Sequence, residues 1–218
     1  KKRNKGGDNP ANSTTPVYSE YEAEKYVHQA VENLQKKGLH SVYHQFSINA
    51  LEVIFKTRKI LSTNTRWAKG IMANGMSSAT DMANGGGKSV FTRIHTIESA
   101  KNANWFNSHQ PAIVVRPEIL TRMDCYCYTS DKFGSKEPGT FEQRVSPEKL
   151  VEQMNSYFTA SHEIMFNDAI DVEPHSIAYI VYNNPKEVID RLIKISITSI
   201  GGNPLEQAVM TQEQFKNI

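Results

Sequence analysis

Short apolar segments of strand length, spread through the middle and late parts of the chain, constrain its fold more than any other feature. They are SVFTRIHTI (89–97), AIVVRP (112–117), MDCYCYT (123–129), HEIMF (162–166) and SIAYIVY (176–182). Each is rich in β-branched, aliphatic or aromatic side chains and is separated from the next by polar turn residues, a pattern that is typical of strands. The series therefore predicts a sheet whose strands are joined largely by turns and loops.

Helical patterns flank these segments. An apolar stripe follows a capping box that begins at Ser19, and Gly38 ends it. A second helix begins after Ser47, and two more begin at Pro147 and Pro185, since proline suits the first helical position. We therefore predict an α+β fold, with one domain, a mostly antiparallel sheet, and N-terminal and flanking helices.

The charge and composition of the chain argue against several classes of protein. Residues 1–16 are basic and then rich in Gly, Asn, Ser and Thr, which predicts a flexible tail or linker before a domain over 17–218. The net charge of +2 argues against nucleic acid or a membrane surface as a bulk partner, although the basic tail could touch phosphate. No apolar run reaches the roughly 18 residues that a membrane-spanning helix needs.

Simple motifs of catalysis are missing. GGGKS (85–89) suggests a phosphate-binding loop, but Met82 stands where that motif requires a glycine. The seven histidines show no metal-ligand spacing, so we expect no metal site. Cys125 and Cys127 are too close along the chain for a useful disulfide. The segment 63–88 has no sustained period and many small polar residues, so we predict an irregular binding loop there.

Three segments, taken in order, carry a more informative pattern. YHQFS (43–47) lies at a strand end that enters a helix, and KILSTNTR (59–66) follows it. GGGKSVFTR (85–93) is a Gly-rich turn that enters a strand. SHEIMFNDAIDVEPHSIAYIV (161–181) puts Glu163 at the start of a strand, with a second strand a short turn later. Over roughly residues 40–182, this chain resembles the ADP-ribosyltransferase superfamily, in particular the mono-ADP-ribosyltransferases of bacterial toxins and effectors.

The resemblance implies a split-sheet domain that uses NAD as co-substrate, without a metal, and transfers ADP-ribose to a macromolecule. The acceptor would be a protein side chain or a nucleic acid, with no membrane involved. The site of action would be the cytoplasm, reached by secretion or injection if the protein is a toxin or effector. Within this scheme, 63–88 would close over NAD and 125–145 would face the acceptor. An NAD glycohydrolase and a catalytically silent binding module with the same fold are the alternatives.

The resemblance also assigns roles to individual residues. It gives catalysis to Glu163 and Arg66. It gives NAD binding to five further residues: His44, Ser47, Phe91, Thr92 and Arg93. Ser161 stands two residues before Glu163, where members that modify arginine usually carry a second glutamate.

The chemistry requires a carboxylate beside the sugar. Breaking the nicotinamide–ribose bond builds positive charge on the ribose, and a fixed carboxylate such as Glu163 would stabilise it. Arg66 or Arg93 could fork onto the diphosphate of NAD. Each residue also has an ordinary structural interpretation: a surface strand glutamate, solvated arginines, a satisfied buried histidine at 44, core packing at 91 and a helix cap at 47.

Overall fold

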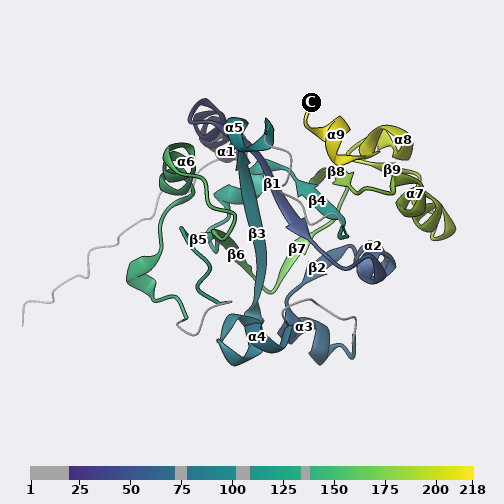
Figure 1. Ribbon diagram of the computed structural model, residues 1–218, viewed down its shortest axis with the longest axis horizontal. Coiled ribbons are helices and arrows are strands. Elements are labelled where there is room, and N and C mark those ends of the chain that lie inside the picture. Colours follow the sequence, from purple (N-terminus) through teal and green to yellow (C-terminus); the bar gives the residue numbers. More distant parts are fainter. Residues whose placement is uncertain (1–19, 72–77, 102–108, 134–137) are drawn as a thin grey trace, which may run out of the picture.

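The computed structural model of the chain describes residues 20–71, 78–101, 109–133 and 138–218, and it is built on a seven-stranded sheet in the order β11-β8-β4-β1-β3-β6-β5 (Figure 1). The strands of this sheet are β1 (Leu39–Gln45), β3 (Ser89–Thr96), β4 (Ala112–Val115), β5 (Tyr126–Tyr128), β6 (Glu163–Asn167), β8 (Ile177–Val181) and β11 (Val209–Met210). All neighbours are antiparallel except β8 and β11. The predicted α+β fold with a mostly antiparallel sheet is confirmed.

Helices and two short strand pairs surround the sheet. The short pairs are β2 (Lys59–Leu61) with β7 (Ala169–Asp171), and β9 (Ser199–Ile200) with β10 (Asn203–Pro204). The α-helices are α1 (Glu20–Lys36), α2 (Leu51–Thr57), α3 (Thr63–Ala68), α4 (Ser78–Ala83), α5 (Ile97–Lys101), α6 (Pro147–Ser156), α7 (Pro185–Lys194), α8 (Leu205–Ala208) and α9 (Gln212–Phe215). Single 3₁₀ turns are η1 (Ile48–Ala50), η2 (Gly86–Lys88), η3 (Pro117–Thr121) and η4 (Phe141–Gln143). Within the described ranges, no helix has both the length and the apolarity to cross a bilayer.

Local signals in the sequence fix where several helices begin and end. Gly38 has a φ of 102°, a left-handed conformation that favours glycine, and it follows the end of α1. The side chain of Ser146 accepts a hydrogen bond from Lys149 N at the start of α6, and Asn184 caps α7 in the same way. Ser47 caps the 3₁₀ turn that leads into α2, as expected.

Strand alternation divides the sheet into two faces. Val90 and Ile94 of β3 face the main core, where they join the apolar sides of α2, α6 and α7. Tyr43 and Val114 face the opposite side, where a smaller cluster includes Phe215 of α9. Phe91, Arg93 and Glu163 of the site described below also lie on this second face, because they alternate with Thr92 and Ile164.

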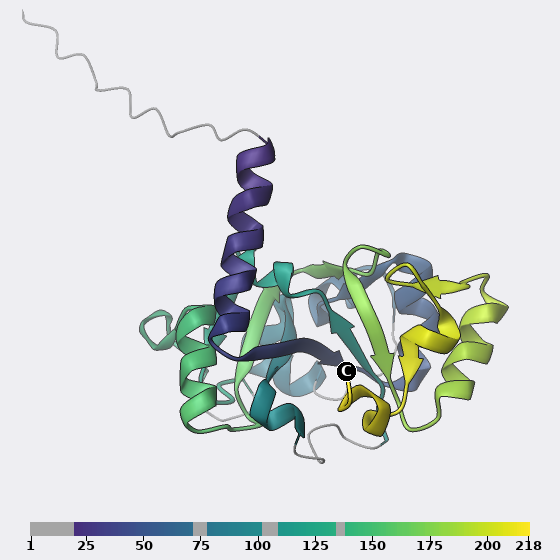
Figure 2. The ribbon, with the colours of Figure 1, turned by 90° about the horizontal axis from the view of Figure 1, so that it is seen from above.

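The structure departs in detail from what the sequence pattern suggests. Helix α1 stands out from the rest of the molecule (Figure 2), so only Val31 and Leu34 of its stripe are buried and Tyr26 is 72% exposed. The segment 63–88 is not a single irregular loop, because α3, α4 and η2 form within it, while 72–77 lies outside the described residues. The predicted tail, 1–16, also lies outside the described residues.

Candidate functional site

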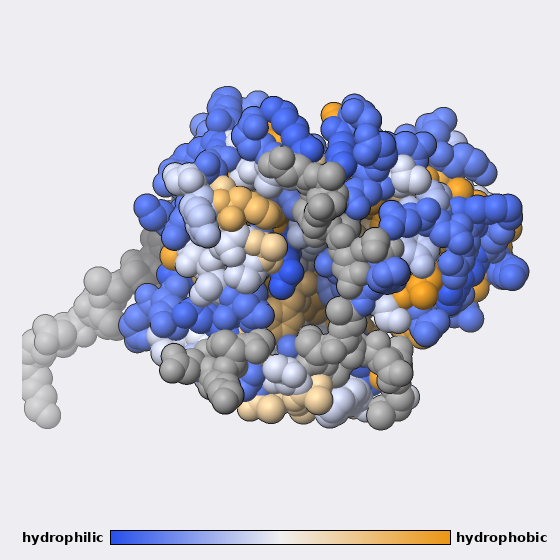
Figure 3. Space-filling model, in the orientation of Figure 1, coloured by the Kyte–Doolittle hydropathy of each residue, from blue (hydrophilic) through white to orange (hydrophobic). Residues whose placement is uncertain are grey.

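Strands β1 and β3 separate at one end of the sheet, and a cavity of about 390 Å³ opens there. The two strands pair as far as Tyr43 opposite Arg93, after which β1 continues beside β4 to Gln45. The first residues of β3 pair with β6. Figure 3 shows a hollow near the middle of this view, with hydrophobic residues at its floor. The volume is within the usual range for small-molecule sites.

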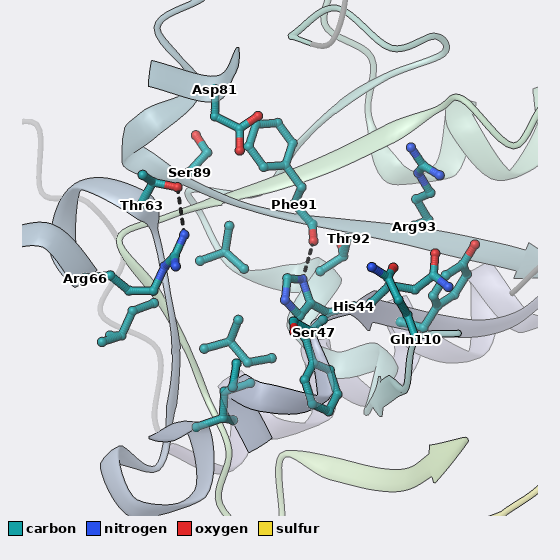
Figure 4. A pocket seen from close by; sticks show the side chains of 18 of the residues that line it. His44, Ser47, Thr63, Arg66, Asp81, Ser89, Phe91, Thr92, Arg93 and Gln110 are labelled. Carbon is teal, nitrogen blue, oxygen red and sulfur yellow. Dashed lines mark hydrogen bonds between the residues drawn. The ribbon is translucent and has the colours of Figure 1, made fainter. Parts of the chain in front are cut away.

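All seven residues that the sequence suggested for catalysis or NAD binding line this one cavity. They come from the end of β1, from α3, from the first half of β3 and from the start of β6, segments that are far apart along the chain. Figure 4 shows most of them around the opening. The seven are His44, Ser47, Arg66, Phe91, Thr92, Arg93 and Glu163.

His44 bridges the gap where the strands part. Its Nδ1 lies 2.7 Å from the carbonyl oxygen of Phe91 (Figure 4), so Nδ1 carries the proton and Nε2 is left as an acceptor. Burial lowers the pKa of His44, and the charge of Arg66 lowers it further, while the bond to Phe91 works in the opposite direction. The ring is therefore a neutral group suited to hydrogen bonding with a ligand hydroxyl.

Arg66 and Arg93 lie on opposite sides of His44 (Figure 4). Arg66 is half-buried in α3, and its Nη2 donates to Thr63 Oγ1 at 3.1 Å. Burial lowers the pKa of Arg66, and the carboxylate of Asp81 opposes that shift. The cavity thus holds two separate cationic groups, which could each contact an anionic part of a ligand.

The β3 residues differ in how they face the cavity. Phe91 is half-buried, and its ring lies 5.8 Å from that of Phe133. Arg93 follows it on the same face. The Thr92 side chain belongs to the other face, because its hydroxyl is buried and donates to Ile164 O at 3.2 Å. Phe91 and Arg93 therefore present side chains to a ligand more directly than Thr92 does.

Glu163 is the most perturbed carboxyl group of the site. It is only 6% exposed, and one of its oxygens, Oε2, accepts a hydrogen bond from Lys132 N at 3.0 Å. The pKa of Glu163 is raised to about 8: burial is the main cause and the carboxyl of Asp131 adds to it, whereas the Lys132 N–H bond and the charge of Arg93 oppose it. The interpretation of Glu163 as an exposed strand residue is excluded. A buried carboxyl with a strongly raised pKa inside a cavity is typical of catalytic groups.

Sequence reasoning missed several polar residues of the cavity, among them Gln45, Gln110 and Asp131. Gln45 Nε2 and Gln110 Oε1 are buried and have no hydrogen-bond partner among the described residues. Gln45 could have been suggested by its place two residues after Tyr43 on the same strand face. Gln110 and Asp131 lie in connecting segments without periodicity, so no local pattern points to them. In the part of the chain that the structure describes, no three His, Cys, Asp or Glu side chains are grouped in a way that could hold a metal ion.

Comparison with known proteins finds a similar fold but no matching sequence family. No family model matches the chain, and no curated protein matches it. The fold is similar to that in the solved structure of Thermosipho africanus DarTG in complex with ADP-ribose, with a TM-score of 0.52 and 13% sequence identity. The match covers 81% of this chain and 51% of the DarTG chain, so this chain spans about half the length of that protein. The chain therefore has a fold that also occurs in a protein solved with ADP-ribose.

Proposed function

We propose that this protein is a mono-ADP-ribosyltransferase that cleaves NAD at the nicotinamide–ribose bond and transfers ADP-ribose to a macromolecular acceptor. The observation that carries the proposal is the convergence of Glu163, both arginines, His44 and Phe91 on one cavity at the split of the sheet. The similarity to the DarTG structure, which contains ADP-ribose, supports the same ligand class.

Glu163 is the residue to which we assign bond cleavage. The nicotinamide ring of NAD is cationic, and a cation beside a buried carboxyl favours its ionised form. As the C1′–N bond lengthens, positive charge moves onto the ribose, where the carboxylate stabilises it. Nicotinamide leaves as a neutral molecule, so this step needs no acid.

The remaining groups fit the other parts of NAD. The two arginines can bind the diphosphate, and the neutral ring of His44 can accept a hydrogen bond from a ribose hydroxyl. The exposed edge of Phe91 can pack against the nicotinamide ring. Gln45 Nε2 and Gln110 Oε1 supply a donor and an acceptor, which match the carbonyl and the amino group of a carboxamide. Buried polar atoms without partners are costly, so a ligand that pairs with them gains affinity.

Release of nicotinamide from NAD by the purified chain tests the proposal. The wild type, Glu163→Gln and the control Glu206→Gln, which changes an exposed glutamate of α8, are compared with and without a cell lysate. We expect turnover in the wild type and the control, and a loss of about 10²–10³-fold in Glu163→Gln. Labelling of a macromolecule from labelled NAD indicates a transferase, whereas release that ignores the lysate indicates a glycohydrolase. Absence of turnover in the wild type would leave a silent binding module.

A further inference from the structure

Asp131 lines the same cavity as Glu163, although the two residues come from different segments. Asp131 lies in the loop after β5, and its neighbour Lys132 donates its backbone N–H to Glu163 Oε2 at 3.0 Å. The loop is fixed on both sides of Asp131. Tyr128 is buried at the end of β5, and the Phe133 ring packs 6.0 Å from the Tyr128 ring. Packed side chains on both sides therefore hold Asp131 beside Glu163.

The carboxyl group of Asp131 lies close enough to raise the pKa of Glu163, because two neighbouring negative charges repel each other. The other polar groups that face Glu163 are Arg93 of β3, Tyr126 of β5 and the backbone N–H of Lys132 in the loop after β5. Arg93 favours ionisation of Glu163, whereas burial opposes it.

The two carboxyl groups differ in how deeply they are buried. Glu163 is 6% exposed and lies opposite Arg93 in the β3–β6 pair, whereas Asp131 is half-buried in the loop after β5. Asp131 is therefore the more accessible of the two carboxyl groups to a molecule that enters from solvent. The sequence has Ser161 two residues before Glu163, so the second acidic group at this site comes from a different part of the chain.

On the basis of the proposed function, we propose that Asp131 is a second catalytic residue, the general base that takes the proton from the acceptor while Glu163 stabilises the ribosyl cation. Binding of the cationic NAD favours ionisation of Glu163, whose proton passes to solvent. The C1′–N bond then breaks with both electrons going to nicotinamide, and an acceptor O–H or N–H group bonds to C1′. The acceptor proton passes to Asp131, which returns it to Glu163 or to solvent before the next turnover. The acceptor class is therefore a nucleophile that must lose a proton.

Asp131→Asn tests this role, with Asp190→Asn on the exposed side of α7 as the matched control. NAD turnover is measured from pH 5.5 to 9, with and without sodium azide, which attacks C1′ as an anion and has no proton to lose. Glu163→Gln is measured in parallel. Thermal melts of all variants establish that they are folded, and Asp131→Ser serves as a second variant if Asp131→Asn is not.

We expect Asp131→Asn to lose about 10²–10⁴-fold in turnover, the usual contribution of a general base. Azide should restore turnover in this variant and give ADP-ribosyl azide, but it should not restore Glu163→Gln. The rise of kcat/KM with pH, which reports the ionisation of Glu163 in the free enzyme, should move to lower pH because a neighbouring negative charge is gone.

Wild-type turnover in folded Asp131→Asn would overturn the inference, as would a loss that azide does not restore in either Asp131 variant. Turnover that depends on Glu163 but not on Asp131 would overturn this inference alone. A wild-type protein that releases no nicotinamide, with or without azide, would overturn the proposed function and this inference together.

Discussion

The two faces of the β3–β6 strand pair each carry a buried polar residue, and the two residues differ in their partners. On the core side, both ring nitrogens of His162 are bonded: Nε2 accepts from Ile94 N at 2.9 Å, and Nδ1 donates to Thr159 O at 2.5 Å. One residue later, Glu163 is nearly as buried, but it lies in a cavity beside a second carboxyl group. Burial alone therefore does not separate a structural polar group from a functional one; the partners do.

The contrast extends to pH. Burial lowers the pKa of His162 from 6.5 to about 4, so the unfolded chain binds more protons and stability is lost as pH falls from about 6.5 to 4. Burial raises the pKa of Glu163 from 4.5 to about 8, so the folded chain binds more protons and stability is lost as pH rises from about 4.5 to 8. Adjacent residues thus weaken the fold at opposite ends of the pH scale.

Replacement of His162 should produce the largest loss of stability. His162→Ala removes the acceptor for Ile94 N and leaves a cavity, which should lower the free energy of unfolding by about 3–5 kcal/mol. Urea denaturation measures the effect at pH 7. His175→Ala, at an exposed turn, is the control and should change stability by less than about 0.5 kcal/mol. Similar stabilities for the two variants would show that His162 is not the structural partner described above.

Replacement of Glu163 should have the opposite sign. Glu163→Gln removes a carboxyl group that resists ionisation, so the variant should be more stable than the wild type by about 4–5 kcal/mol at pH 8, since each unit of raised pKa is worth about 1.4 kcal/mol. The difference should shrink as pH falls and vanish near pH 4.5. Urea denaturation at several pH values, with Glu206→Gln as control, measures it. A pH-independent difference would contradict the raised pKa.

Local patterns made much of this arrangement predictable. Residues 89–97 and 162–166 have the composition of strands, and both segments form strands of the central sheet. The segment 63–88 was misjudged because helices of six residues, such as α3 and α4, are too short to display a helical period. Alternation along β3 could have separated Phe91 and Arg93 from Thr92, but it does not say which face meets the cavity.

The cavity as a whole could not be derived from periodicity. Its partners are set by strand order, which brings β6 beside β3 across more than 60 residues of chain. Family resemblance supplied Glu163 and the β1 and β3 positions, whereas Asp131 and Gln110 depend on the course of loops.

Arg66 extends the comparison from carboxyl groups to cations. A bond between an arginine and a phosphate is charge-assisted, so Arg66→Ala should lower kcat/KM for NAD by about 10–100-fold. Stability should change by less than about 1 kcal/mol. Arg58→Ala removes an exposed arginine outside the cavity and is the control. If Arg66→Ala loses stability and keeps its kinetics, Arg66 belongs with His162 among the structural groups.

Gln110 should give the smallest effect and the sharpest distinction. Its Oε1 is buried without a partner among the described residues, so Gln110→Leu removes a desolvation cost and should raise the free energy of unfolding by up to about 1 kcal/mol. The same change removes a ligand contact and should weaken NAD binding by about 2–10-fold, measured by calorimetry in the Glu163→Gln background. Gln153→Leu on the exposed side of α6 is the control. A structural residue loses stability when it is replaced, whereas a residue held ready for a ligand gains stability and loses binding. Opposite signs in one variant would assign Gln110 to the same functional side as Glu163, and a loss of stability would return it to the scaffold.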